Sequence, residues 1–175
     1  SRMEFKGVSD PATIGIGGVD LGSQAGIGWA GTGTLNIVNG GALVMNATHI
    51  STGLRDGAFF IGRDPGSVGT TTLSGTGSLL DVPGSIRIAL GPGDAPGGTG
   101  ALTVSSGGLV TATDIRVGAG GILNGAGGTI DGSVVNLGGI GAPGLSPGTL
   151  TILGDYTQQA GQLVLEIGED GVADL

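Results

Sequence analysis

The chain contains no cysteine among its 175 residues, which excludes disulfide frameworks, thiol catalysis and cysteine-ligated zinc. Aromatic residues make up only 3% of the sequence, so a core built on large rings is excluded. No apolar run is long enough to cross a bilayer as a helix. Charged residues make up 11% and leave a net charge of -8. A surface of that sign repels phosphate, so nucleic acid and anionic lipid are not expected partners.

Glycine is abundant, with 42 residues, and it is accompanied by 7 prolines. Without a pattern, such a composition is typical of low-complexity chains. The mean hydropathy of +0.36 opposes disorder, because an apolar and weakly charged chain does not stay solvated by default. The glycines are therefore expected to belong to a structural pattern.

The pattern is a repeat, in which residues 60–88 align with residues 89–117 at a constant offset of 29. The aligned segments are Ile61-Gly62 with Leu90-Gly91, Gly69–Leu73 with Gly98–Leu102, and Ser85–Ile88 with Asp114–Val117. A looser copy begins at Leu21. Self-similarity at such a period is the sequence signature of a repeat architecture.

Within each copy, apolar residues alternate with small or polar ones. Leu35 and Ile37 share one face, as do Ile86 and Ile88. Alternation over three to six residues between glycine-rich turns predicts short strands. No window has a helical period, and we expect a loop over Ala47–Phe60.

Short strands in a regular repeat predict an all-β solenoid of glycine-rich repeats, a parallel β-helix. A single coil buries too few aliphatic side chains to offset its backbone entropy, so it depends on the coils above and below it. The alternative fold is an antiparallel β-sandwich, for which Asn39-Gly40 and Asp131-Gly132 are the best hairpin turns. The ungapped repeat favours the solenoid.

Arg87 and Arg116 are charged residues related by the repeat. If their strands are neighbours, the two backbones lie about 4.8 Å apart. The guanidinium groups then repel each other unless they splay or share an acid. Clustered arginines also suit anions, so an anion-binding ladder and a plain solvated face are the two interpretations.

Motifs for nucleophilic catalysis are weak in this sequence. Gly144–Gly148 matches the G-x-S-x-G pattern around Ser146, but Pro147 follows the serine where a helix would have to begin. The single histidine, His49, has no supporting context for a catalytic triad. We interpret Ser146 as a turn residue and His49 as a loop or surface residue.

Acidic residues do not align with one another across the repeat. Glycan cleavage needs two or three carboxylates, or a basic residue with an acid, on one face. A step of 29 residues carries Asp64 and Asp94 onto uncharged residues, and a step back from Asp114 does the same. The sequence therefore predicts no catalytic residue, no cofactor and no metal site. Weak calcium binding by isolated turn acids such as Asp64, Asp94 and Asp131 is the alternative.

The last 35 residues differ from the repeat and carry a resemblance of their own. The segment reads GAPGLSPGTLTI over Gly141–Ile152, GDYTQQAG over Gly154–Gly161, LVLEI over Leu163–Ile167, and ADL at Ala173–Leu175. It resembles the C-terminal end of the passenger domains of bacterial autotransporters. The upstream Gly-Thr-Gly-x-Leu-x-Val copies resemble repeats of the same passengers.

The resemblance implies a right-handed β-helix that is secreted across the outer membrane of a Gram-negative bacterium and displayed at the cell surface. It implies a membrane β-barrel after residue 175 as a partner, and a glycan or protein of a host or surface as another. It also implies an autochaperone role for the C-terminal coils, which fold first and template the rest. The residues expected to form this folding seed are Leu150, Ile152, Tyr156, Leu163, Leu165 and Ile167.

The expected organisation has three parts. Residues 1–6 read as a cloning scar, residues 7–140 as repeat coils, and residues 141–175 as the autochaperone-like end. The expected function is a non-catalytic surface stalk or adhesin module. The alternatives are an extracellular or ice-facing repeat protein outside the autotransporter system, and a fragment of a polysaccharide-active enzyme. Thr-x-Thr ranks would favour ice, but at an offset of 29 Thr70 and Thr72 have no such partner.

Overall fold

The structure is a computed structural model that describes residues 2–6, 13–15, 24–45, 57–144 and 148–166. The described residues form an all-β fold of fifteen strands in one sheet, with a single short 3₁₀ turn, η1 (Pro92–Asp94). All pairings between the strands are parallel. The antiparallel sandwich considered as an alternative is therefore wrong.

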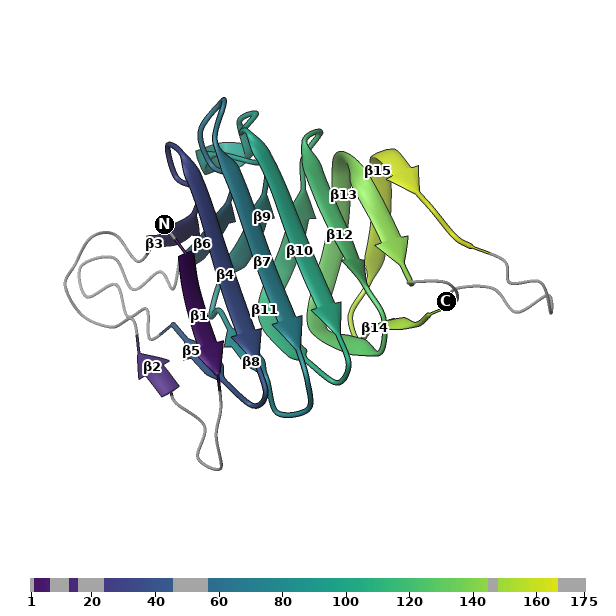
Figure 1. The fold of residues 1–175 in the computed structure, drawn as a ribbon. Coiled ribbons are helices and arrows are strands. Elements are labelled where there is room, and N and C mark those ends of the chain that lie inside the picture. Colours follow the sequence, from purple (N-terminus) through teal and green to yellow (C-terminus); the bar gives the residue numbers. More distant parts are fainter. Residues whose placement is uncertain (1, 7–12, 16–23, 46–56, 145–147, 167–175) are drawn as a thin grey trace.

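The strands lie in three rows, and the chain visits the rows in turn, which gives a solenoid-like shape (Figure 1). Row 1 contains β1 (Arg2–Lys6), β4 (Thr32–Val38), β7 (Val68–Ser74), β10 (Thr99–Ser105), β12 (Gly121–Gly125) and the end of β13 (Gly128–Pro143). Row 2 contains β2 (Thr13–Gly15), β5 (Ala42–Val44), β8 (Leu79–Asp81), the start of β11 (Leu109–Val117), the start of β13, and β14 (Leu150–Ile152). Row 3 contains β3 (Gln24–Ile27), β6 (Ala58–Ile61), β9 (Ser85–Ile88), the end of β11, the middle of β13, and the start of β15 (Tyr156–Leu163). The end of β15 pairs with the end of β13 and so belongs to row 1.

The core is an aliphatic interior in which like side chains stack from coil to coil. In β4, β7 and β10, buried positions alternate with half-exposed ones, as the period of two predicts. The interior stacks include Leu43, Leu80, Val110 and Ile130 in row 2, and Phe59, Ile86, Ile115 and Val134 in row 3. This burial is the main source of stability, at about 25 cal/mol for each Å² of apolar surface removed from water.

The constant offset of 29 is confirmed only in part. Ser85–Ile88 lies opposite Asp114–Val117, as expected. Elsewhere the expected alignment is wrong by two residues, because Ile61 lies opposite Ile88 and Leu73 opposite Val104. The connection between β9 and β10 contains η1 and takes up the extra residues, so the strands keep their pairing while the coil length changes.

One further expectation is corrected. The loop expected up to Phe60 is wrong for residues 58–60, which belong to the buried strand β6. Its four consecutive apolar residues hid the alternation, because Phe60 points away from the core interior and is buried against Trp29 instead. Residues 2–6 form β1 and pair with β4, with Met3 opposite Leu35; their interpretation as a cloning scar stays a prediction.

Glycine at the corners has a steric reason, which Gly62 illustrates. This residue follows β6 and has a φ of 72°, a conformation that glycine adopts without strain. A Cβ atom there would lie 2.0 Å from the carbonyl oxygen of Thr99 in the next coil. The corner therefore needs glycine both for its backbone angle and for the close approach of neighbouring coils.

Candidate functional site

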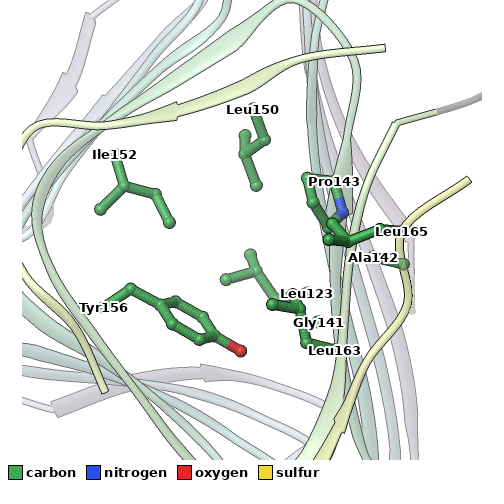
Figure 2. A pocket seen from close by; sticks show the side chains of 9 residues that line it. All are labelled: Leu123, Gly141, Ala142, Pro143, Leu150, Ile152, Tyr156, Leu163 and Leu165. Carbon is green, nitrogen blue, oxygen red and sulfur yellow. The ribbon is translucent and has the colours of Figure 1, made fainter. Parts of the chain in front are cut away.

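The C-terminal end of the solenoid contains an apolar hollow with a cavity volume of about 170 Å³. Figure 2 shows side chains from successive coils pointing into it, with Leu150, Ile152 and Tyr156 on one side and Leu123 and Leu163 across from them. The lining is completed by Gly141, Ala142, Pro143 and Leu165. The coil formed by β14 and β15 pairs with β13 on one side. Among the described residues no strand pairs with its other side, so the apolar side chains at this end leave a hollow.

Five of the six residues predicted for the folding seed line this hollow. Leu150 is buried, and Ile152 and Tyr156 are partly buried against the core. Leu163 and Leu165 are 45% and 50% exposed, because no further described strand covers them. Val164 does not line the hollow, so Leu163 and Leu165 share the inner side as the alternation predicted. The sixth residue, Ile167, lies outside the described residues.

A buried amide next to the hollow fixes the corner of β13, and the sequence analysis missed it. Asn136 is 1% exposed and accepts hydrogen bonds from the N–H groups of Gly138 and Gly139 at 3.1 and 2.8 Å. Its Nδ2 donates to the carbonyl oxygens of Gly139 and Gln162 at 3.1 and 3.2 Å. Asn136 therefore joins two successive coils through satisfied polar contacts. A polar residue at an inward position was the only available signal.

The amide network extends to the tyrosine of the hollow. Asn136 Nδ2 donates to Gln158 Oε1 at 3.2 Å, and the Tyr156 hydroxyl donates to the same oxygen at 2.5 Å. The phenol ring therefore contributes apolar surface to the hollow while its hydroxyl keeps a partner, as buried tyrosines do. The position of Tyr156 is therefore fixed by the packing of its ring against the core and by the hydrogen bond of its hydroxyl group.

The stacked arginines form an ion-pair cluster on the outer face of row 3. Arg116 lies opposite Arg87 in the strand register, as expected. Asp94, on the η1 turn, accepts hydrogen bonds from Arg116 Nη2 at 2.5 Å and Nε at 2.9 Å, and lies 3.7 Å from Arg87 Nη1. Asp114 Oδ2 accepts a hydrogen bond from Arg116 Nη1 at 3.2 Å. The two arginines thus share an acid, which is one of the two solutions that the sequence allowed.

The cluster is electrically self-compensating. The hydrogen bonds between Arg116 and Asp94 raise the pKa of the Arg116 guanidinium above its ordinary value. Burial acts in the opposite direction, and Asp114 adds to the increase. On the same side of the molecule, Arg63 pairs with Asp64 at 2.5 Å and lies 4.2 Å above the Trp29 ring. Each of these guanidinium groups has an acidic neighbour, so the arrangement favours a structural role over an anion-binding ladder.

The expectation that acids stay apart is wrong for one pair. Asp94 and Asp114 meet at Arg116 because the η1 connection folds back over the coil, which an alignment by constant offset does not reveal. Both carboxylates are hydrogen-bonded to the Arg116 guanidinium group, so each is used in an ion pair within the molecule. His49 and Ser146 lie outside the described residues. Within the described ranges, no three histidine, aspartate or glutamate side chains are grouped as metal ligands.

Comparisons with known proteins add no relative: no family model, curated protein or solved structure matches the chain significantly. In the part of the chain that the structure describes, no helix has the length and apolar character needed to span a membrane.

Proposed function

We propose that this chain is a non-catalytic structural segment of a bacterial autotransporter passenger, displayed at the surface of a Gram-negative cell as a rigid stalk or adhesin module. The observation that carries the proposal is the continuous stacking of aliphatic side chains from coil to coil. Such an interior produces a long, stiff shape, and the ion pairs of the described residues are used within the molecule. Its partners are its own membrane barrel and a surface glycan or protein.

The fold within this proposal is a right-handed parallel β-helix. Parallel strands of one sheet joined by crossover connections are right-handed in about 98% of known cases. The three rows of parallel strands, each continued once per coil, fit that arrangement. The resemblance of residues 141–175 to passenger ends points to the same fold.

The C-terminal coils act as the folding seed in this proposal. Each coil in a solenoid gains stability mainly from its neighbours, so growth needs one stable start. The Asn136 network and the lining of the hollow concentrate polar and apolar contacts between the last coils. A chain that emerges C-terminal end first from an outer-membrane pore would find this seed ready before the other coils arrive.

Display on cells tests the proposal directly. The chain is fused ahead of an autotransporter barrel in a Gram-negative host, and surface exposure is measured by protease digestion of intact cells. The wild-type chain should reach the surface and resist digestion. Leu150→Asp should stall inside the cell, because it puts a charge into the seed, whereas Leu43→Asp, in the same row near the other end, should still be exported.

Two results would overturn the proposal. Failure of the folded wild-type chain to appear on the surface argues against a passenger. Equal export of the Leu150 and Leu43 variants leaves a surface segment without a C-terminal seed. A fold check by circular dichroism on both purified variants separates export defects from general misfolding.

A further inference from the structure

The outward face of three neighbouring strands in row 1, β4, β7 and β10, differs from the rest of the outer surface. Strands β4, β7 and β10 have seven residues each and pair one to one over their full length, without a bulge. Their sequences TGTLNIV, VGTTTLS and TGALTVS contain no charged and no aromatic residue. Charges surround these strands: β1, the neighbour of β4 in the same row, contains Arg2, Glu4 and Lys6 opposite Thr34, Asn36 and Val38, and rows 2 and 3 carry charges at outward positions, including Asp81 and Arg87. Figure 1 shows row 1 as an open front of side-by-side strands.

Twelve outward side chains make up this surface, which we call the threonine face. They are Thr32, Thr34, Asn36 and Val38 in β4, Val68, Thr70, Thr72 and Ser74 in β7, and Thr99, Ala101, Thr103 and Ser105 in β10. All are half-exposed or exposed. Regular pairing places them in a grid with a spacing of about 4.8 Å between strands and about 6.6 Å along each strand.

The observed register also removes the argument that the sequence raised against such a grid. At an offset of 29, Thr70 and Thr72 would lie next to Thr99 and Ala101. In the structure Thr72 lies opposite Thr103, and Thr70 lies opposite Thr34. Thr32 and Thr34 form a second Thr-x-Thr pair in the neighbouring strand. Threonine therefore continues across all three strands.

We propose that the threonine face adsorbs to ice. A partner of this face must be uncharged, because the face carries no charge on a protein with a net charge of -8. It must also tolerate a small contact, since the grid covers roughly 300–400 Å², against about 800 Å² per partner in a stable protein interface. The absence of rings in these strands disfavours stacking with sugars.

Ice satisfies these conditions because it is uncharged and periodic. Thr34, Thr70, Thr72 and Thr103 each present a methyl group, beside which water is restricted in orientation, and a hydroxyl that can donate one hydrogen bond and accept two. The Thr99 hydroxyl already donates to the carbonyl oxygen of Ser67 at 3.5 Å. A rigid grid of such groups holds a layer of water in a repeat that a growing ice surface can incorporate. The strand ladder supplies the rigidity, because β4, β7 and β10 each pair with a strand on both sides, β1 and β12 being the outer neighbours.

The test uses the purified full chain and ice itself as the probe. The freezing hysteresis and the shape of a single ice crystal are measured in dilute protein against buffer. The wild-type chain should hold the crystal without growth over a measurable temperature gap. Thr72→Lys and Thr103→Lys should each reduce that gap to the value of buffer, because a hydrated cation breaks the grid. Thr111→Lys, an outward threonine of row 2, is the matched control and should keep the gap.

Melting temperature and circular dichroism of each variant identify any loss of fold. Because Thr72→Lys and Thr103→Lys lie on different strands, one of them still tests the inference if the other does not fold. Absence of hysteresis in the folded wild-type chain overturns the inference, as does an equal loss in Thr111→Lys. Dimerisation by the threonine face, or binding to microcrystalline cellulose that Thr72→Lys removes, would assign the face to another partner. Surface display is measured separately, so failure of the proposed function and failure of this inference remain distinguishable.

Discussion

Thr71 occupies an inward position in the apolar core, and its replacement by valine should stabilise the protein. The residue is fully buried in β7, between Leu35 and Leu102 of the neighbouring strands, and its hydroxyl has no hydrogen-bond partner. Valine has nearly the same shape and removes that group. A buried polar group without a partner costs about 1–3 kcal/mol, so we expect a gain of about 1–2 kcal/mol in the free energy of unfolding.

Urea titration followed by circular dichroism measures this gain. For a chain of this size, 1 kcal/mol corresponds to about 2–4 °C in Tm. Thr72→Val, which faces outward on the same strand, is the matched control and should change stability by less than about 0.5 kcal/mol. Thr71→Ser keeps the hydroxyl and loses the methyl group, so it should destabilise. If Thr71→Val lowers stability, or only matches Thr72→Val, the inward placement of Thr71 is refuted.

Three further substitutions test the C-terminal end and the ion-pair cluster. Leu165→Asp should cost more stability than Val164→Asp, by only about 1 kcal/mol because half of Leu165 is already exposed; equal melting temperatures would contradict the inner side assigned to Leu165. Asn136→Ala should lower the free energy of unfolding by about 2–4 kcal/mol, because two N–H groups lose their acceptor, and a loss below that range in urea titration would show that water replaces the amide. Asp94→Asn should cost about 0.5–1 kcal/mol at low salt and less at high salt, because it leaves Arg116 and its neighbouring arginine without their shared acid; a cost that is independent of salt would argue against charge as the cause.

The strands were predictable wherever alternation was clean. Leu35 and Ile37 were assigned to one face, and both are buried. The pairing of Arg87 with Arg116 also followed from the repeat. Coulomb repulsion left two solutions, splayed side chains or a shared acid, and the structure has the shared acid. These features depend on side chains one strand apart, which a repeat in the sequence encodes directly.

The remaining features depend on contacts that no local pattern encodes. The offset failed at Leu73 because the η1 connection changes the coil length without changing the strand pairing. Phe60 was not recognised as part of a strand because its burial comes from Trp29, which the fold brings over the outer face. Asn136 was missed because an inward amide is unfavourable until two turns of backbone supply its partners. Each miss lies where a connection or a distant coil decides the environment of a residue.

Variation in coil length is confined to the connections, and this bears on both proposals. A coil takes 36 residues from Thr32 to Val68 and 31 from Val68 to Thr99, yet β4, β7 and β10 keep the same length and pair one to one. If one coil lost a strand residue, the hydrogen bonds to the coils on both sides would be lost with it. A longer connection between strands leaves all of these hydrogen bonds in place. Stacking therefore keeps these three strands regular although the connections differ in length. The proposed stalk needs that regularity for stiffness, and the proposed threonine face needs it for an even spacing of side chains, so both proposals depend on the same stacking of strands.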